Sequence, residues 1–280
     1  GNYGVMDQAA AMKWIHENIK QFGGDPDNIM IFGQSAGAGS VQTLCSSPIA
    51  KGLISKAISM SGGGLNAVGS SGGIGRIATT LAQAEATNKT MMDNAGKTTL
   101  EQMRALSFEE ITAMASQGGG GRMFYSPIVD NYFLTGSFSD MARANEIPDV
   151  PYMFGCTAND MGDMTKPIGD FCALRNEKSK KPAYAYIFSR QLPGENGSAF
   201  HSSDLWYIFH SFRHSWRPFT KGDEALSLQM VDYWTNFAKY GNPNGKDGGI
   251  WTAYTKEKPE FMNLDANENE KLCTMTATPK

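Results

Sequence analysis

The sequence predicts an α/β protein in which a mostly parallel central sheet is flanked by helices. A helical pattern over Asp7–Phe22 is followed by the apolar run Ile29–Phe32, which is typical of a buried parallel strand. A glycine-rich turn and a helix of small residues come next, and Ala57–Met60 is predicted to be another strand. Helices that alternate with short apolar strands in this order form parallel sheets with crossover connections.

The first helix is predicted from apolar residues that recur at helical spacing, namely Ala11, Trp14, Ile15, Ile19 and Phe22. Gly23 and Gly24 are expected to end it, because glycine adopts positive φ at low cost. Further strands are predicted over Val150–Gly155 and Ala183–Arg190.

A last helix is predicted over Glu224–Tyr240, and Gly241 to Pro243 form its stop signal. Its expected apolar face consists of Leu228, Val231, Trp234, Phe237 and Ala238.

Composition and charge exclude several classes of protein. The chain has 280 residues, 41% hydrophobic and 19% charged, with a formal net charge of -3. This length fits a single domain, and the charge offers no basic surface for nucleic acid or anionic lipid. No apolar run is long enough to span a bilayer. Four scattered cysteines are expected to be buried hydrophobes with at most one bridge, and we expect no metal and no cofactor.

Residues 33–37 match G-x-S-x-G, the pattern of a nucleophile elbow between a strand and a helix. The strained turn needs small residues two before and two after the serine, which here are Gly33 and Gly37. A second match around Ser71 follows no apolar strand and leads into no helical pattern. We therefore predict Ser35 as the nucleophile and the Ala36 N–H as an oxyanion donor, and the alternative is a purely structural turn.

A serine hydroxyl is a weak nucleophile without a base, so a histidine is required downstream. After Ser35 the chain contains His201, His210 and His214, and spacing alone leaves all three open. His16 precedes the nucleophile and breaks the order serine, acid, histidine that is typical of this elbow.

Several blocks in one order resemble the type-B carboxylesterases, the family of the cholinesterases and bacterial para-nitrobenzyl esterases. Around the Ser35 elbow these blocks are residues 1–4, 7–8, 14–19 and 22–26. The resemblance recurs at residues 127–130, 150–155, 199–204, 233–238 and 241–244, and so covers nearly the whole chain. It implies an α/β-hydrolase fold and makes His201 the histidine of a catalytic triad, with His210 and His214 as bystanders.

The same resemblance implies a glutamate in a loop like G-x-x-x-D-E-G. In this chain Met161 is expected at the place of that glutamate, and a thioether cannot stabilise an imidazolium. Asp160, one residue earlier, is therefore the favoured acid, and Asp163, two residues later, is the alternative. It is also open that both aspartates only cap loops, as aspartate beside glycine usually does.

The family takes further oxyanion donors and several strands from a region upstream of the block that begins at Gly1. We therefore expect residues 1–280 to be the C-terminal portion of a single α/β-hydrolase domain, lacking its N-terminal strands. A missing N-terminal segment or a homodimer could complete it. With no readable targeting signal, a cytoplasmic, periplasmic or secreted location stays open.

The predicted function is hydrolysis of a small-molecule carboxylic ester through an acyl-enzyme, with Ser35, His201 and Asp160 as triad. One alternative is a catalytically degenerate, cholinesterase-like binding module. Another is an amide or thioester hydrolase, because the triad alone does not select the substrate.

Overall fold

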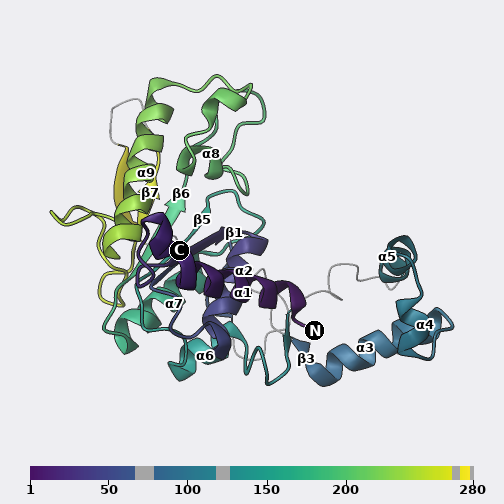
Figure 1. Ribbon diagram of the computed structural model, residues 1–280. Coiled ribbons are helices and arrows are strands. Elements are labelled where there is room, and N and C mark those ends of the chain that lie inside the picture. Colours follow the sequence, from purple (N-terminus) through teal and green to yellow (C-terminus); the bar gives the residue numbers. More distant parts are fainter. Residues whose placement is uncertain (67–78, 118–126, 267–271, 278–280) are drawn as a thin grey trace.

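The computed structural model describes residues 1–66, 79–117, 127–266 and 272–277, and its centre is a six-stranded sheet (Figure 1). The strand order is β1-β2-β5-β6-β7-β8, and all neighbours are parallel except β7 and β8. The strands are β1 (Met30–Gln34), β2 (Lys56–Met60), β5 (Tyr152–Thr157), β6 (Ala183–Phe188), β7 (Glu260–Leu264) and β8 (Cys273–Ala277). The predicted mostly parallel sheet is confirmed, whereas β7 and β8 are additional to the prediction.

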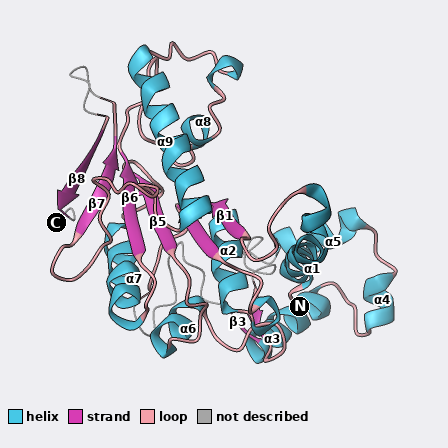
Figure 2. Cartoon of the chain, turned by 60° about the vertical axis from the view of Figure 1, so that its left-hand side comes forward, coloured by secondary structure: helices cyan, strands magenta, loops and turns pink. Residues whose placement is uncertain are grey.

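Helices cover both faces of the sheet, and each face has its own apolar core (Figure 2). On one face lie α1 (Tyr3–Asn18), α2 (Ala36–Ser46), α6 (Phe138–Ala144) and α7 (Thr165–Lys178). On the other lie α8 (Leu205–Ile208) and α9 (Lys221–Tyr240). Because the sheet is buried on both faces, β2, β5 and β6 are buried along their whole length.

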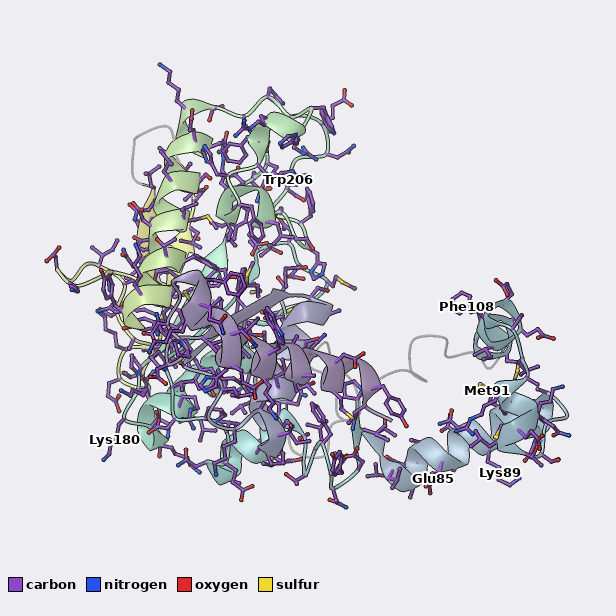
Figure 3. The ribbon with its side chains drawn as sticks, in the orientation of Figure 1. Glu85, Lys89, Met91, Phe108, Lys180 and Trp206 are labelled. Carbon is purple, nitrogen blue, oxygen red and sulfur yellow. The ribbon has the colours of Figure 1, made fainter. Side chains whose placement is uncertain are left out.

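Three helices stand away from the sheet (Figure 1). They are α3 (Leu81–Asn94), α4 (Leu100–Arg104) and α5 (Phe108–Gln117). At their base, β3 (Thr79–Thr80) pairs in parallel with β4 (Ile128–Val129). Figure 3 shows Glu85, Lys89 and Phe108 on these three helices, far from the sheet, and Phe108 is 79% exposed.

Three short 3-10 turns complete the described elements. They are η1 (Ile19–Phe22), η2 (Pro48–Ala50) and η3 (Phe212–His214).

The first predicted helix forms as α1, which begins four residues earlier than predicted and continues into η1, but the residues of its periodic apolar pattern are not its buried ones. Its buried residues are Ala9 and Met12, which pack into the core shared with α2. Trp14 is 56% exposed and Phe22 is 73% exposed. Helical periodicity identifies an apolar face but not its partner, and no described element covers this one.

A similar shift occurs on α9. Of the predicted face, Trp234 and Phe237 are buried, whereas Leu228 is 54% exposed. The stripe that packs on the sheet consists of Leu226, Met230, Tyr233, Trp234 and Phe237. The helix also begins earlier than predicted, because Thr220 and Asp223 form a reciprocal capping box at its start.

Candidate active site

The predicted elbow is a sharp turn between β1 and α2. Ser35 has φ 57° and ψ -115°, a strained backbone for a residue other than glycine. Its N–H donates to Met60 O at 2.8 Å, which fixes the turn to β2. A Cβ on Gly33 would lie 2.4 Å from the Gly37 carbonyl carbon, so this glycine is required. At Gly37, in contrast, an added Cβ would meet no atom of the described residues within 4 Å. A small residue is therefore required at Gly33, as predicted, but not at Gly37.

His201 lies beside Ser35, 166 residues later in the sequence. Its Nε2 is 2.8 Å from Ser35 Oγ, and its Nδ1 is 2.6 Å from Asp160 Oδ1. A carboxylate only accepts hydrogen bonds, so Nδ1–H donates to it and Nε2 can accept from the serine hydroxyl. The His201 side chain is 22% exposed, while that of Asp160 is 1% exposed.

Asp160 is surrounded by donors besides His201. Its Oδ2 accepts from Ser61 Oγ at 2.6 Å and from Thr157 Oγ1 at 3.0 Å, and its Oδ1 accepts from Met161 N at 2.8 Å. Burial alone raises the pKa of Asp160, but the hydrogen bonds outweigh burial and hold the pKa below its ordinary value. The side chain is therefore a carboxylate at neutral pH. The expected alignment of Met161 with the glutamate of G-x-x-x-D-E-G is wrong by one residue: counted without a gap from Gly155, Asp160 is the sixth residue and takes that place.

The other candidate residues lie in different surroundings. Asp163 Oδ1 accepts from Thr165 N at 2.9 Å and from Thr165 Oγ1 at 2.7 Å, at the start of α7. His210 Nδ1 lies 2.8 Å from Ser227 Oγ, and His214 belongs to η3. His16 Nδ1 is 3.0 Å from Pro26 O, and Ser71 lies outside the described residues. The structure thus brings Asp160, and not Asp163, to His201.

Two polar groups near this site are absent from the sequence prediction. Gln34 Nε2 lies 3.3 Å from His201 Nε2, on the nitrogen that faces Ser35. Ser61, at the end of β2, has a positive φ of 54° that aims its hydroxyl at Asp160. The second position of the elbow pattern, directly before the serine, could have indicated Gln34, whereas a positive φ at a serine leaves no readable signal in the sequence.

A second buried carboxyl, Asp204, follows His201 by three residues. It is 0% exposed, and its Oδ2 accepts from Tyr186 Oη at 3.5 Å. Its Oδ1 has no hydrogen-bond partner within the described residues. Burial raises the pKa of Asp204 to about 7, and the negative charge of Asp160 acts in the same direction.

Three of the four cysteines agree with the expectation of buried hydrophobes, and Cys273 is only partly buried. All four are free thiols, and Cys45, Cys156 and Cys172 are buried. Across the described ranges, no group of three or more histidine, cysteine or acidic side chains is arranged to hold a metal ion. Among the helices described, none has the length and apolar character that crossing a bilayer requires.

Comparison with known proteins identifies the family. The Carboxylesterase family matches residues 1–170 and 161–278. Bovine carboxylesterase 4A is 26% identical, over 95% of this chain and 62% of its own length. The para-nitrobenzyl esterase of Bacillus subtilis is 27% identical, over 95% of this chain and 64% of its own length. This chain thus spans under two thirds of the length of both relatives.

The fold is shared with solved structures. A thermophilic PNB esterase superposes on all of this chain with a TM-score of 0.81, at 24% identity and over 67% of its own length. The expected α/β-hydrolase fold is confirmed. Because the family match runs across nearly the whole sequence, this chain belongs to the carboxylesterase family, as its resemblance to type-B carboxylesterases indicates.

Proposed function

We propose that this protein hydrolyses carboxylic esters through an acyl-enzyme formed on Ser35. The observation that carries the proposal is the unbroken chain of contacts from Ser35 Oγ to His201 at 2.8 Å and from His201 to Asp160 at 2.6 Å. These two contacts support the assignment of Ser35 as nucleophile, His201 as base and Asp160 as acid. The names of the relatives, a carboxylesterase and a para-nitrobenzyl esterase, support an ester as substrate.

In the proposed mechanism, Ser35 Oγ attacks the ester carbonyl while His201 Nε2 takes the hydroxyl proton. His201 then gives this proton to the departing alcohol, and water, activated by the same nitrogen, releases the acid. Asp160 holds the imidazole in the correct tautomer and stabilises its charged form. The Ala36 N–H, at the first position of α2, donates to the oxyanion, where the helix dipole adds to its effect.

Residues 1–280 belong, in this proposal, to the C-terminal portion of one hydrolase domain. Within the described part of the chain, β1 has β2 on one side and no strand on the other. Phe32 on this edge strand is 45% exposed, which supports a further segment or subunit that covers the edge. Such a segment would also supply the oxyanion donors that accompany Ala36.

A degenerate binding module is less well supported, because such a protein has no need to keep Ser35 and His201 in contact. An amide or thioester hydrolase would use the same residues, and no contact described here favours it.

The proposal is tested with Ser35→Ala in the protein that the gene encodes. We expect kcat for a short-chain aryl ester to fall about 10⁴-fold or more, because the covalent route is lost while binding remains. Ser71→Ala, in the second copy of the pattern, serves as the control and should retain full kcat. If Ser71→Ala were the inactive variant, or if Ser35→Ala kept its activity, the proposal would be wrong.

A further inference from the structure

The acid and the histidine come from two separate segments, so their contact depends on how these segments are held together. Asp160 follows β5, whereas His201 lies in a turn beyond β6. The turn is closed by a hydrogen bond from Ser203 N to Phe200 O at 2.9 Å, and Ser202 adopts a positive φ of 74°. Both residues thus lie in loops outside the strands of the sheet.

Asn159, the residue before the acid, joins the two loops. Its backbone N–H donates to Ala199 O at 2.9 Å, and its side-chain Oδ1 accepts from Ala199 N at 3.2 Å. Asn159 also forms an isolated parallel bridge with Phe200, the residue directly before His201. Both backbone groups of Ala199 are thus bound by one asparagine.

The burial of these groups explains why the asparagine side chain matters. Asn159 is exposed, whereas Ala199 is fully buried. Asn159 Oδ1, although it belongs to an exposed residue, therefore accepts the hydrogen bond of the buried Ala199 N–H. It also accepts from Gln191 Nε2 at 3.3 Å. A buried donor without its acceptor is costly, so the histidine turn is expected to shift when this oxygen is removed.

The far side of the turn has a different anchor. The Phe200 ring packs edge-on against Trp206 of α8, with ring centroids 6.0 Å apart; Figure 3 shows Trp206 in this part of the molecule. The turn is thus held by an aromatic contact on one side and by Asn159 on the other. Of these two anchors, Asn159 is the one that is directly adjacent to Asp160 in the sequence.

We propose that Asn159 is a positioning residue that sets the distance between Asp160 and His201 by hydrogen-bonding Ala199. This inference rests on the proposed triad. Asn159 touches no reacting atom, and it acts by keeping the acid within hydrogen-bond reach of Nδ1. Small displacements in a catalytic site lower the rate strongly, since a shift of about 1 Å can cost about 100-fold.

The first test compares three variants on an aryl ester. Asn159→Ala should lower kcat about 10-fold and leave KM within about twofold, because binding is not involved. Asn159→Asp keeps the acceptor for Ala199 N and should restore most of kcat. Asn18→Ala is the control: the Asn18 side chain also hydrogen-bonds the backbone, in this case donating to Trp14 O at 2.8 Å, but it lies on α1. It should behave as the unsubstituted protein.

The second test is a double-mutant cycle with Asp160→Asn. If Asn159 acts through the acid, Asn159→Ala should lower kcat less than about twofold in the Asp160→Asn background. A structural role would give the full 10-fold loss in both backgrounds. Equal losses, an unchanged kcat in Asn159→Ala, or failure of Asn159→Asp to restore kcat would overturn the inference. Inactivity of the unsubstituted protein, or activity in Ser35→Ala, would instead reject the proposed triad.

Discussion

Two buried carboxyl groups lie on either side of His201 in the sequence, and their surroundings affect them in opposite ways. Asp160 accepts hydrogen bonds from Ser61, Thr157 and other donors, which lower its pKa despite burial. Asp204 has one long bond from Tyr186 and an oxygen without a partner within the described residues, and burial raises its pKa to about 7.

The comparison shows that burial alone does not decide whether an acid near the site is charged. The supply of donors decides it, because each hydrogen bond to the carboxylate offsets part of the lost hydration. A charged acid can orient the imidazole and stabilise its protonated form, whereas an acid that holds its proton near neutral pH cannot. The surroundings thus distinguish two carboxyl groups of the same type: Asp160 has the donors that keep it charged beside His201, and Asp204 does not.

The largest effect is expected for Asp160→Asn. The amide would favour the wrong imidazole tautomer, so kcat for an aryl ester should fall about 10³–10⁴-fold. Asp163→Asn removes a carboxylate that bonds Thr165 and should change kcat far less. Steady-state kinetics on both variants check this. A greater loss in Asp163→Asn would reverse the assignment of the acid.

A smaller effect, on stability, is expected for Asp204→Asn. A carboxyl with a folded pKa of about 7 binds its proton more tightly than in the unfolded chain, where the pKa is about 4. Its contribution to stability is complete below about pH 4 and is lost as the pH rises through about 7. The variant should lack this decline, which amounts to at most about 4 kcal/mol.

Urea unfolding at several pH values measures this difference. Asp232→Asn, on the exposed side of α9, is the matched control and should keep the decline of the unsubstituted protein. If Asp204→Asn lost as much stability between pH 4 and pH 8 as the control, the contrast between the two acids would not hold.

Much of the sheet and of the site could be predicted from the sequence, because local signals specify them. The apolar run before Gly33 and the small residues after Ser35 predict strand, turn and helix, and these form β1 and α2. The resemblance over residues 199–204 singled out His201 from three histidines that spacing could not separate.

Other features depend on tertiary partners that the sequence does not reveal. The apolar face of α1 around Trp14 is exposed, and on α9 the stripe through Met230 replaces the predicted one through Leu228. β8 is only partly buried, which weakens its apolar pattern. The bonds of Asn159 to Ala199 join residues 40 positions apart, so no local signal predicts them.

The central claim, that Ser35 is a nucleophile activated by His201, is tested most directly by covalent labelling. An alkyl fluorophosphonate reacts with an activated serine, and peptide mass spectrometry then locates the added group. The account predicts a single modified serine, Ser35, and a labelling rate at least about 100-fold lower in His201→Ala, because the base is removed. Labelling at another serine, or an unchanged rate in His201→Ala, would contradict it.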